Sequence, residues 1–246
     1  MTMNETRLTF ASIRRALAQG LTTAQRTRGV SVGYAGVFAI IGAVIAGGLI
    51  KAGMTPFFVA AAGAFMLVGP ITLAGFFGVA RAVEAGRKAG ADDVFNGFHH
   101  PPGALWAVAL VCTLLFMIFV TDAGILYSYL IGGTRLFPAD MLPLPANVAG
   151  FLFWSAASGA VIAFLLFTVS AFSIPLLCER RTHLVAAIVT SVRIVFGNFA
   201  VTMAWAIFIS AAIMASIVIL PLFPFVLPVL AYASHALYRE ALPPGS

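Results

Sequence analysis

The chain has 246 residues, of which 61% are hydrophobic and only 9% are charged, and its formal net charge at pH 7 is +6. An average globular protein holds about 45–50% apolar and about 25% charged residues. Together with a mean hydropathy of +1.04, these values exclude a soluble domain with a polar surface. They also exclude a disordered chain and a secreted disulfide scaffold, and Cys112 and Cys178 match no zinc spacing. The composition predicts an all-α integral membrane protein.

Residues 1–29 hold five arginines and no long apolar run, so they do not resemble a signal peptide. An apolar stripe recurs here at steps of three and four residues, formed by Phe10, Ile13, Leu17, Leu21 and Ala24. Such a stripe beside arginines predicts an amphipathic helix on the inner membrane surface. We therefore expect a cytoplasmic arm at 1–29, a membrane domain at 30–240 and a tail at 241–246.

Six apolar stretches reach or approach the roughly 20 residues that a helix needs to cross a bilayer. They are residues 32–50, 57–80, 104–131, 149–178, 199–220 and 222–238. We expect six transmembrane helices in three hairpins, each preceded by a cytoplasmic amphipathic interfacial helix. The sixth stretch is the shortest, and Pro221 and Pro224 predict a tight turn before it.

The basic residues predict the orientation. Twelve of the 14 Lys and Arg residues fall in the arm, after the second span, after the fourth span or in the tail. Because basic residues collect on the cytoplasmic side of bacterial membranes, this distribution fits six spans with both termini in the cytoplasm. Only Lys51 and Arg135 are expected on the other side. A five-span arrangement would place the tail outside, and only Arg239 argues against it.

Two more segments, 184–199 and 92–98, are predicted to be interfacial helices, the second with Asp92 or Asp93 as its cap. Each of the three interfacial helices precedes two spans. The sequence therefore predicts three pseudo-repeats of helix plus hairpin, at about 7–81, 92–181 and 182–240.

Each predicted return helix contains a proline, and these are Pro70, Pro175 and Pro228. One interpretation is a packing kink, since prolines are common in membrane helices; the other is a hinge or an opened carbonyl that binds a ligand. Glycines are frequent in the first two spans, at Gly36, Gly42, Gly47, Gly48, Gly63, Gly69, Gly75 and Gly78. Because small residues let membrane helices approach closely, the first hairpin is predicted to be tightly packed.

Three groups of residues carry a family resemblance. The first is Gly69-Pro70, Gly75-Phe76-Phe77 and Arg81; the second is Ile174-Pro175-Leu176-Leu177, Glu179-Arg180, Ala187, Thr190-Ser191-Val192, Asn198 and Trp205; the third is Leu227-Pro228-Val229-Leu230 and His235-Ala236-Leu237-Tyr238-Arg239. Over most of residues 30–240 the chain resembles the bacterial integral membrane proteins of domain of unknown function 2189. Ser234 stands where that family usually has Trp. The resemblance implies a membrane fold and no assigned reaction, and labels of some members imply a link to cytochrome oxidase.

Asp122 is the one acid within a predicted span. A charge there costs several kcal/mol unless it is paired or neutralised. One interpretation is a proton or cation site with Tyr127 or Tyr129 near it. The other is a protonated, structural aspartate that bonds to Thr121 or to a neighbouring helix.

The stretch from His235 to Arg239 ends the last predicted span. His235 and Arg239 are four residues apart and share one helix face, with Tyr238 at the lipid boundary. Arg239 is expected to reach lipid phosphates or a carboxylate such as Glu179 or Glu84. This group is predicted either to anchor the sixth span or to bind a partner.

No cofactor, metal or catalytic site is expected. The histidines His99, His100, His183 and His235 lie near the cytoplasmic face but lack a helical ligand spacing. No Gly-rich loop precedes Lys-Ser or Lys-Thr, and no nucleophile is paired with a base. Because the arginines flank the spans, the positive charge points to anionic lipids and not to nucleic acid.

Two functions remain in competition. The first is a non-enzymatic inner-membrane accessory, assembly or scaffold component of a membrane complex, with a membrane-protein partner and with a respiratory oxidase as the example that the family labels imply. The alternative is a small solute, proton or cation transporter or channel that uses Asp122 and the proline-broken helices.

Overall fold

The structure is a computed structural model that describes residues 6–99, 102–141, 143–179 and 181–243. Its helices are α1 (Phe10–Arg26), α2 (Arg28–Lys51), α3 (Phe57–Glu84), α4 (Ala91–His99), α5 (Pro102–Leu130), α6 (Ala146–Ser170), α7 (Ser173–Cys178), α8 (Leu184–Gly197), α9 (Phe199–Val218) and α10 (Phe223–Ala241), with the short 3₁₀ turns η1 (Pro138–Met141) and η2 (Leu220–Leu222). Within these residues no strand forms, and Met54 and Leu136 make one isolated bridge. The all-α fold class is confirmed.

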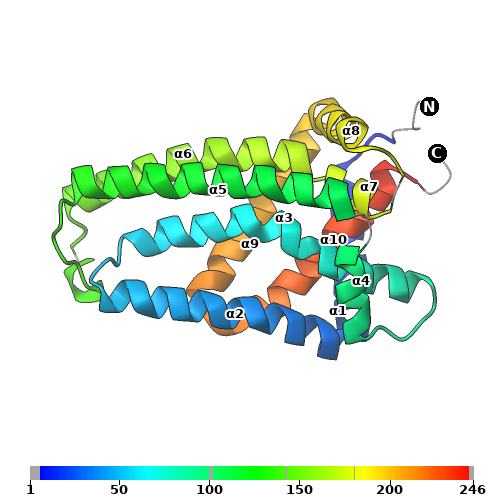
Figure 1. Ribbon diagram of the computed structural model, residues 1–246, viewed down its shortest axis with the longest axis horizontal. Coiled ribbons are helices and arrows are strands. Elements are labelled where there is room, and N and C mark those ends of the chain that lie inside the picture. Colours follow the sequence, from blue (N-terminus) through cyan, green and yellow to red (C-terminus); the bar gives the residue numbers. More distant parts are fainter. Residues whose placement is uncertain (1–5, 100–101, 142, 180, 244–246) are drawn as a thin grey trace.

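Five helical stretches of the described chain are long and apolar enough to cross a membrane. They are Arg28–Lys51, Trp106–Leu130, Ala146–Cys178, Phe199–Val218 and Leu220–Ala241. The remaining predicted span coincides with α3, a helix of 28 residues that runs alongside the others in Figure 1. The turn predicted at Pro221 and Pro224 is present as η2.

Figure 1 shows α1, α4, α7 and α8 gathered at one end of the molecule with both ends of the described chain. The backbone N–H of Thr6 donates to the carbonyl of Ala241 at 3.0 Å, so these chain ends are in contact. We call this end the charged end. The opposite end, the loop end, holds the connections that follow α2 and α5, which are tied by hydrogen bonds of Leu136 with Gly53 and Thr55.

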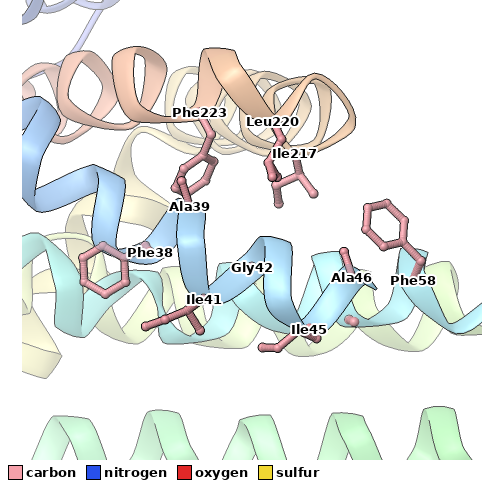
Figure 2. Close-up of a pocket in the computed structure, with 11 residues that line it drawn as sticks. Phe38, Ala39, Ile41, Gly42, Ile45, Ala46, Phe58, Ile217, Leu220 and Phe223 are labelled. Carbon is pink, nitrogen blue, oxygen red and sulfur yellow. The ribbon is translucent and has the colours of Figure 1, made fainter. Parts of the chain in front are cut away.

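The turn between α9 and α10 lies beside α2. It lines a small apolar cavity of about 70 Å³ together with α2 residues from Phe38 to Ala46. Figure 2 shows Ile217, Leu220 and Phe223 pointing from this turn toward α2. The third hairpin is therefore packed on the first one through apolar side chains.

The fourth predicted span is broken near the charged end. The long stretch 149–178 divides into α6 and α7, and Ser191 of α8 bridges the break. Its hydroxyl accepts a hydrogen bond from the N–H of Phe172 at 3.2 Å and donates one to the carbonyl of Thr168 at 2.8 Å. The hydroxyl of Ser191 thus stands between the N–H of Phe172 and the carbonyl of Thr168, which a continuous helix would join directly. Pro175 has no N–H to donate to the carbonyl of Ala171, so the ladder is also interrupted there.

The helix predicted in the arm is present as α1, and its most buried face is not the predicted apolar stripe. Its buried residues are Ser12, Ala16 and Gly20, which lie against α10. A Cβ atom on Gly20 would stand only 2.6 Å from the carbonyl oxygen of Val229. Phe10 and Leu21 of the predicted apolar stripe are exposed. Ile13, Leu17 and Ala24 of the stripe are half-buried and pack against the core, so the small residues make the closest contact with α10 and only part of the stripe faces outward.

Helices α4 and α8, in the other two segments predicted to be interfacial, also dock on the bundle. A Cβ atom on Gly97 of α4 would lie 2.1 Å from the carbonyl of Ala74 in α3. Asp93, not Asp92, caps α4, because its carboxylate accepts the N–H of Gly90 at 2.9 Å. Helix α8 packs on α6 and α7. Each interfacial helix thus contacts the return helix of another predicted unit, in the cyclic order α1 on α10, α4 on α3 and α8 on α6–α7.

The predicted tight packing of the first hairpin is wrong for α2. Added Cβ atoms on its glycines, Gly29, Gly33, Gly36, Gly42, Gly47 and Gly48, would meet no atom within 4 Å. Helix α2 packs more extensively on α10 than on α3. Its contact with α3 includes Tyr34, whose ring covers Gly75 and whose hydroxyl donates to the carbonyl of Thr72 at 3.1 Å. Glycine frequency alone did not show which neighbours the glycines meet.

Candidate functional site: an arginine ring at the charged end

Three arginines link the ends of three helices in a closed order. The Arg81 Nη1 of α3 donates to the carbonyl of Cys178, the last residue of α7, at 2.8 Å. Arg181, just after α7, donates to the carbonyls of Leu242 and Pro243, just after α10, at 2.9 and 2.7 Å. Arg239 of α10 donates to Glu84, the last residue of α3, at 2.7 Å. We call these arginines and their acceptors the arginine ring.

The positions of the arginines follow from the chemistry of helix ends. The last carbonyls of a helix lack partners within it and carry partial negative charge, so a guanidinium group is a favourable neighbour. Helices α3, α6–α7 and α10 all run toward the charged end, where Figure 1 shows their ends close together. Arg81 and Arg181 therefore satisfy carbonyls at or just beyond the ends of neighbouring helices, whereas Arg239 pairs with the side chain of the last residue of α3.

Glu179 is the buried anion of this site, with a side chain that is 10% exposed. Its Oε2 accepts hydrogen bonds from the hydroxyl of Tyr238 at 2.8 Å and from Arg239 at 3.4 Å. Its Oε1 lies 3.2 Å from Arg239 Nη2 and 3.6 Å from His235 Nε2, and it accepts no well-aligned hydrogen bond. Burial by itself would raise the pKa of Glu179, but the nearby His235, the hydrogen bond from Tyr238 and the charge of Arg239 hold it below its usual range.

His235 is buried between two carboxylates. Its Nδ1 lies 3.4 Å from Glu84 and its Nε2 lies 3.6 Å from Glu179. The ring of Phe77 packs against it, with centroids 5.3 Å apart. In its doubly protonated form His235 would pair with both acids. The expected contact of α10 with the inner ends of the second and fourth spans is therefore present, through Tyr238 and Arg239 as well as His235.

The family signatures gather here. Phe76 contacts the rings of Tyr34 and Tyr232, with centroids 4.8 and 5.8 Å apart. Asn198, from the second signature, accepts the backbone N–H of Leu8 through Oδ1 at 2.8 Å and so holds the arm. The second and third signatures supply Glu179 and the segment from His235 to Arg239. In the structure, these signature residues make the contacts that hold the charged end together.

The three prolines have separate settings. Pro175 and Pro228 are buried, the first beside the α6–α7 break and the second inside α10. The carbonyl of Thr168 near Pro175 is occupied by Ser191. Pro70 lies within α3, and its side chain is outside the part of the structure that is described.

Asp122 lies away from the arginine ring, in the part of α5 toward the loop end. Its Oδ2 is buried and has no hydrogen-bond partner, so the expected bond to Thr121 or a neighbouring helix is missing at this atom. Tyr129 points outward and is exposed, while Tyr127 packs against Phe57 and Phe151. Neither tyrosine completes a polar site around the aspartate.

Sequence reasoning missed two parts of the ring. Arg81 was recognised only as a signature residue, and Arg181 only as a basic residue near a span. Arg81, Arg181 and Arg239 each lie shortly after the proline of a return helix. This shared position was the available signal, because a residue there lies where the helix ends. Glu240, which also holds the arm, was missed as well. Its carboxylate accepts a hydrogen bond from the hydroxyl of Ser12 at 2.5 Å and pairs with Arg15.

The site is suited to holding helices together. Its groups are cations, carboxylates and a tyrosine, without a hydroxyl or thiol nucleophile aligned with a base. Over the described ranges, no three His, Cys, Asp or Glu side chains gather as metal ligands would. His100 lies outside those ranges, the side chain of His99 is not described, and His183 is exposed at the start of α8.

Long apolar helices with a polar cluster at one end define a multi-pass helical integral membrane protein. A family model described as "Predicted integral membrane protein (DUF2189)" matches residues 57–179, half of the chain. The chain belongs to this family. The match runs from the start of α3 to just after α7, and the third signature lies beyond it. No curated protein and no solved structure matches the chain.

Proposed function

We propose that this protein is a non-enzymatic accessory, assembly or scaffold component of a bacterial inner-membrane complex, with a respiratory oxidase as the first candidate. The arginine ring carries the proposal. Its charged groups bond to one another and to helix ends, which leaves the apolar sides of the bundle as the surfaces for a partner or for lipid.

The proposed topology has six spans with both termini in the cytoplasm. The hydrogen bond between Thr6 and Ala241 supports it, because chain ends on the same side require an even number of crossings. Five candidate spans plus α3 make six. Lys51 and Arg135 at the loop end, opposite the basic residues of α1 and α8, support the orientation. We further propose that α1, α4 and α8 lie at the inner interface.

Labelling of single cysteines tests the topology. In a background without Cys112 and Cys178, cysteines at Thr55 and Ala139 should react with an impermeant thiol reagent from the periplasm. A cysteine at Ala89, near the charged end, should stay unlabelled from that side. Labelling at Ala89 in place of Thr55 and Ala139 would reverse the proposed orientation.

Purification in mild detergent with mass spectrometry tests the role. Specific co-purifying subunits of a membrane complex support the accessory proposal. A monomer or homodimer that moves a solute or protons in liposomes contradicts it.

One observation favours the transporter alternative. The buried, unpartnered Oδ2 of Asp122 is available for a proton or a cation, and such groups in spans often mark transport pathways. Asp122→Asn keeps the shape while removing the possible charge. Loss of a measured transport activity at normal membrane abundance would favour this alternative, whereas unchanged abundance and function would mark the residue as structural.

A further inference from the structure

The pair of helices α5 and α6 carries two buried polar oxygens. Figure 1 shows these helices side by side, and the chain runs along them in opposite directions. Among the described residues, four buried side-chain oxygens have no hydrogen-bond partner, and two of them, Asp122 Oδ2 and Ser155 Oγ, lie on this pair. Ser155 is only 4% exposed. Buried polar groups are normally hydrogen-bonded, so two such atoms on neighbouring helices point to a missing ligand.

Three contacts fix the register of α5 on α6. A Cβ atom on Gly159 would stand 2.9 Å from the ring of Phe119. The rings of Tyr127 and Phe151 follow toward the loop end, with centroids 5.4 Å apart. Nearest the loop end, a Cβ atom on Gly150 would lie 4.0 Å from Leu130 Cδ1. The contacts advance along α5 as they go back along α6, so each level of one helix has a known level on the other.

Asp122 and Ser155 lie between the first two of these contacts. Asp122 is three residues after Phe119, and Ser155 is four residues before Gly159. Residues three or four apart share one face of a helix, so both side chains lie on the faces that meet, about one turn from the Phe119 contact. In the described structure the two oxygens do not bond to each other. A group between them would satisfy both.

The charge of Asp122 has no side-chain counterpart in these helices. Neither α5 nor α6 contains Lys, Arg or His. An ionised carboxylate within a span costs several kcal/mol unless it is paired or neutralised, and buried charges in proteins are paired or coordinate metal ions. A single carboxylate balances a single positive charge, so the ligand that fits this site is monovalent.

The ligand atoms favour a hard cation. An ionised carboxylate only accepts, and a serine hydroxyl has lone pairs to offer besides its proton. Hard cations take carboxylate and neutral oxygens as ligands, with water completing the shell. At 1.5 Å per residue, Asp122 lies about 12 Å from Leu130 at the end of α5, and about 30 Å from Pro102 at its start. The ion therefore has its shorter path from the loop end.

We propose that Asp122 and Ser155 form a binding site for one small monovalent cation of the Na⁺ type between α5 and α6. Asp122 Oδ2 supplies the charge and Ser155 Oγ a neutral ligand, so the ion joins the two helices where they lack a direct polar contact. The accessory role proposed above does not depend on this site, and the site requires no movement of ions across the membrane.

Carbodiimide labelling of the full-length protein tests the site. Dicyclohexylcarbodiimide modifies protonated carboxyl groups in apolar surroundings, and a bound cation blocks the reaction. The purified protein in mild detergent is treated in rising NaCl or in choline chloride of equal ionic strength, and the modified peptides are quantified by mass spectrometry. At about ten times the dissociation constant only about one site in eleven is free, so Na⁺ should slow the labelling of Asp122 about tenfold.

The two salts separate a cation from a proton. Any labelling of Glu179, the buried carboxylate of the charged end, should be the same in both salts and serves as the internal control. Equal labelling of Asp122 in the two salts would show a carboxyl group that holds only a proton, and would overturn the cation site. Equal slowing of Asp122 and Glu179 by Na⁺ would show a general effect of the salt and would overturn it too.

Matched variants test the second ligand. Ser155→Ala should raise the Na⁺ concentration of half-protection about tenfold, which corresponds to about 1.4 kcal/mol. Ser128→Ala, which removes a hydroxyl from an exposed position of α5, should leave that concentration unchanged. Equal effects of the two variants would overturn Ser155 as a ligand.

Thermal unfolding answers if the reagent does not reach Asp122. NaCl, compared with choline chloride, should raise the unfolding temperature of the parent protein and not that of Asp122→Asn, which keeps the shape of the side chain without its charge. The same response to Na⁺ in both proteins would overturn the site.

Discussion

At the charged end, α10 is buried at almost every turn, and its last residues bond to α1, α3 and the segment after α7. Toward the loop end, Ile40 and Val44 of α2 are 67% and 71% exposed, and no atom approaches the glycines of that helix. The helices are similarly apolar in both regions. What differs is the supply of polar and small residues that can make specific contacts.

The difference follows from the solvent. Lipid is as apolar as leucine, so burying an apolar helix face against another helix in a bilayer brings little hydrophobic gain. Close packing at small residues and hydrogen bonds between helices supply the association free energy instead. The structure concentrates both at the charged end, so we expect substitutions there to cost more than matched substitutions at the loop end.

The largest expected effect is that of Glu179→Ala. It removes the one carboxylate that contacts His235, Tyr238 and Arg239 together, so the buried hydroxyl of Tyr238 loses its acceptor and Arg239 keeps only Glu84. We expect a loss of about 3 kcal/mol in the free energy of unfolding, measured by unfolding in detergent. Asp140→Ala, at an exposed position of the loop end, should cost less than about 1 kcal/mol. Similar losses in the two variants would contradict the expectation that substitutions at the charged end cost more than those at the loop end.

Gly20→Ala and Gly36→Ala should change the stability of the protein in opposite directions. The first places a Cβ atom 2.6 Å from Val229 O and 2.7 Å from Ala233 N, both backbone atoms that cannot move away, so α1 should dock less well on α10. We expect it to cost about 2 kcal/mol. The second meets open space and should stabilise α2 by up to about 1 kcal/mol through its helix propensity. Thermal unfolding of the two variants in one detergent measures both; a loss in both would show that α2 is packed more tightly than described.

Arg239→Ala should have a smaller effect, of about 1 kcal/mol, because this guanidinium group is partly exposed and its acceptor Glu84 more so. Arg135→Ala, at the loop end, is the control and should leave the unfolding temperature unchanged. If Arg239→Ala also leaves it unchanged while a co-purifying partner is lost, the segment from His235 to Arg239 is a docking site and not an anchor.

Glu179 should make the stability of the protein depend on pH on the acid side. The pKa of Glu179 is lower in the folded protein than its ordinary value of 4.5. Its ionised form therefore favours folding: the contribution is complete above pH 4.5 and is lost as the pH falls through the folded-state pKa. Unfolding temperatures between pH 7 and pH 3 should fall less steeply in Glu179→Gln than in the parent. Parallel curves would show that the ionised form of Glu179 does not stabilise the folded protein.

The long helices were predictable because the signal is local. A run of apolar residues must form a helix in lipid, since its backbone groups have no other partner. The predicted span 57–80 begins where α3 begins, and the span 199–220 begins where α9 begins. The break before Pro175 was harder to place, because it depends on Ser191, a residue of another helix.

The sequence by itself determined the membrane environment, the helical class, the turn at Pro221 and the partners expected for Arg239. Only the tertiary structure decided that Ser12, Ala16 and Gly20 face α10, that Arg81 and Arg181 close the arginine ring, and that the glycines of α2 meet no helix. These outcomes depend on which faces of apolar helices meet, and a nearly uniform apolar sequence carries little information about that, because every face is equally soluble in lipid.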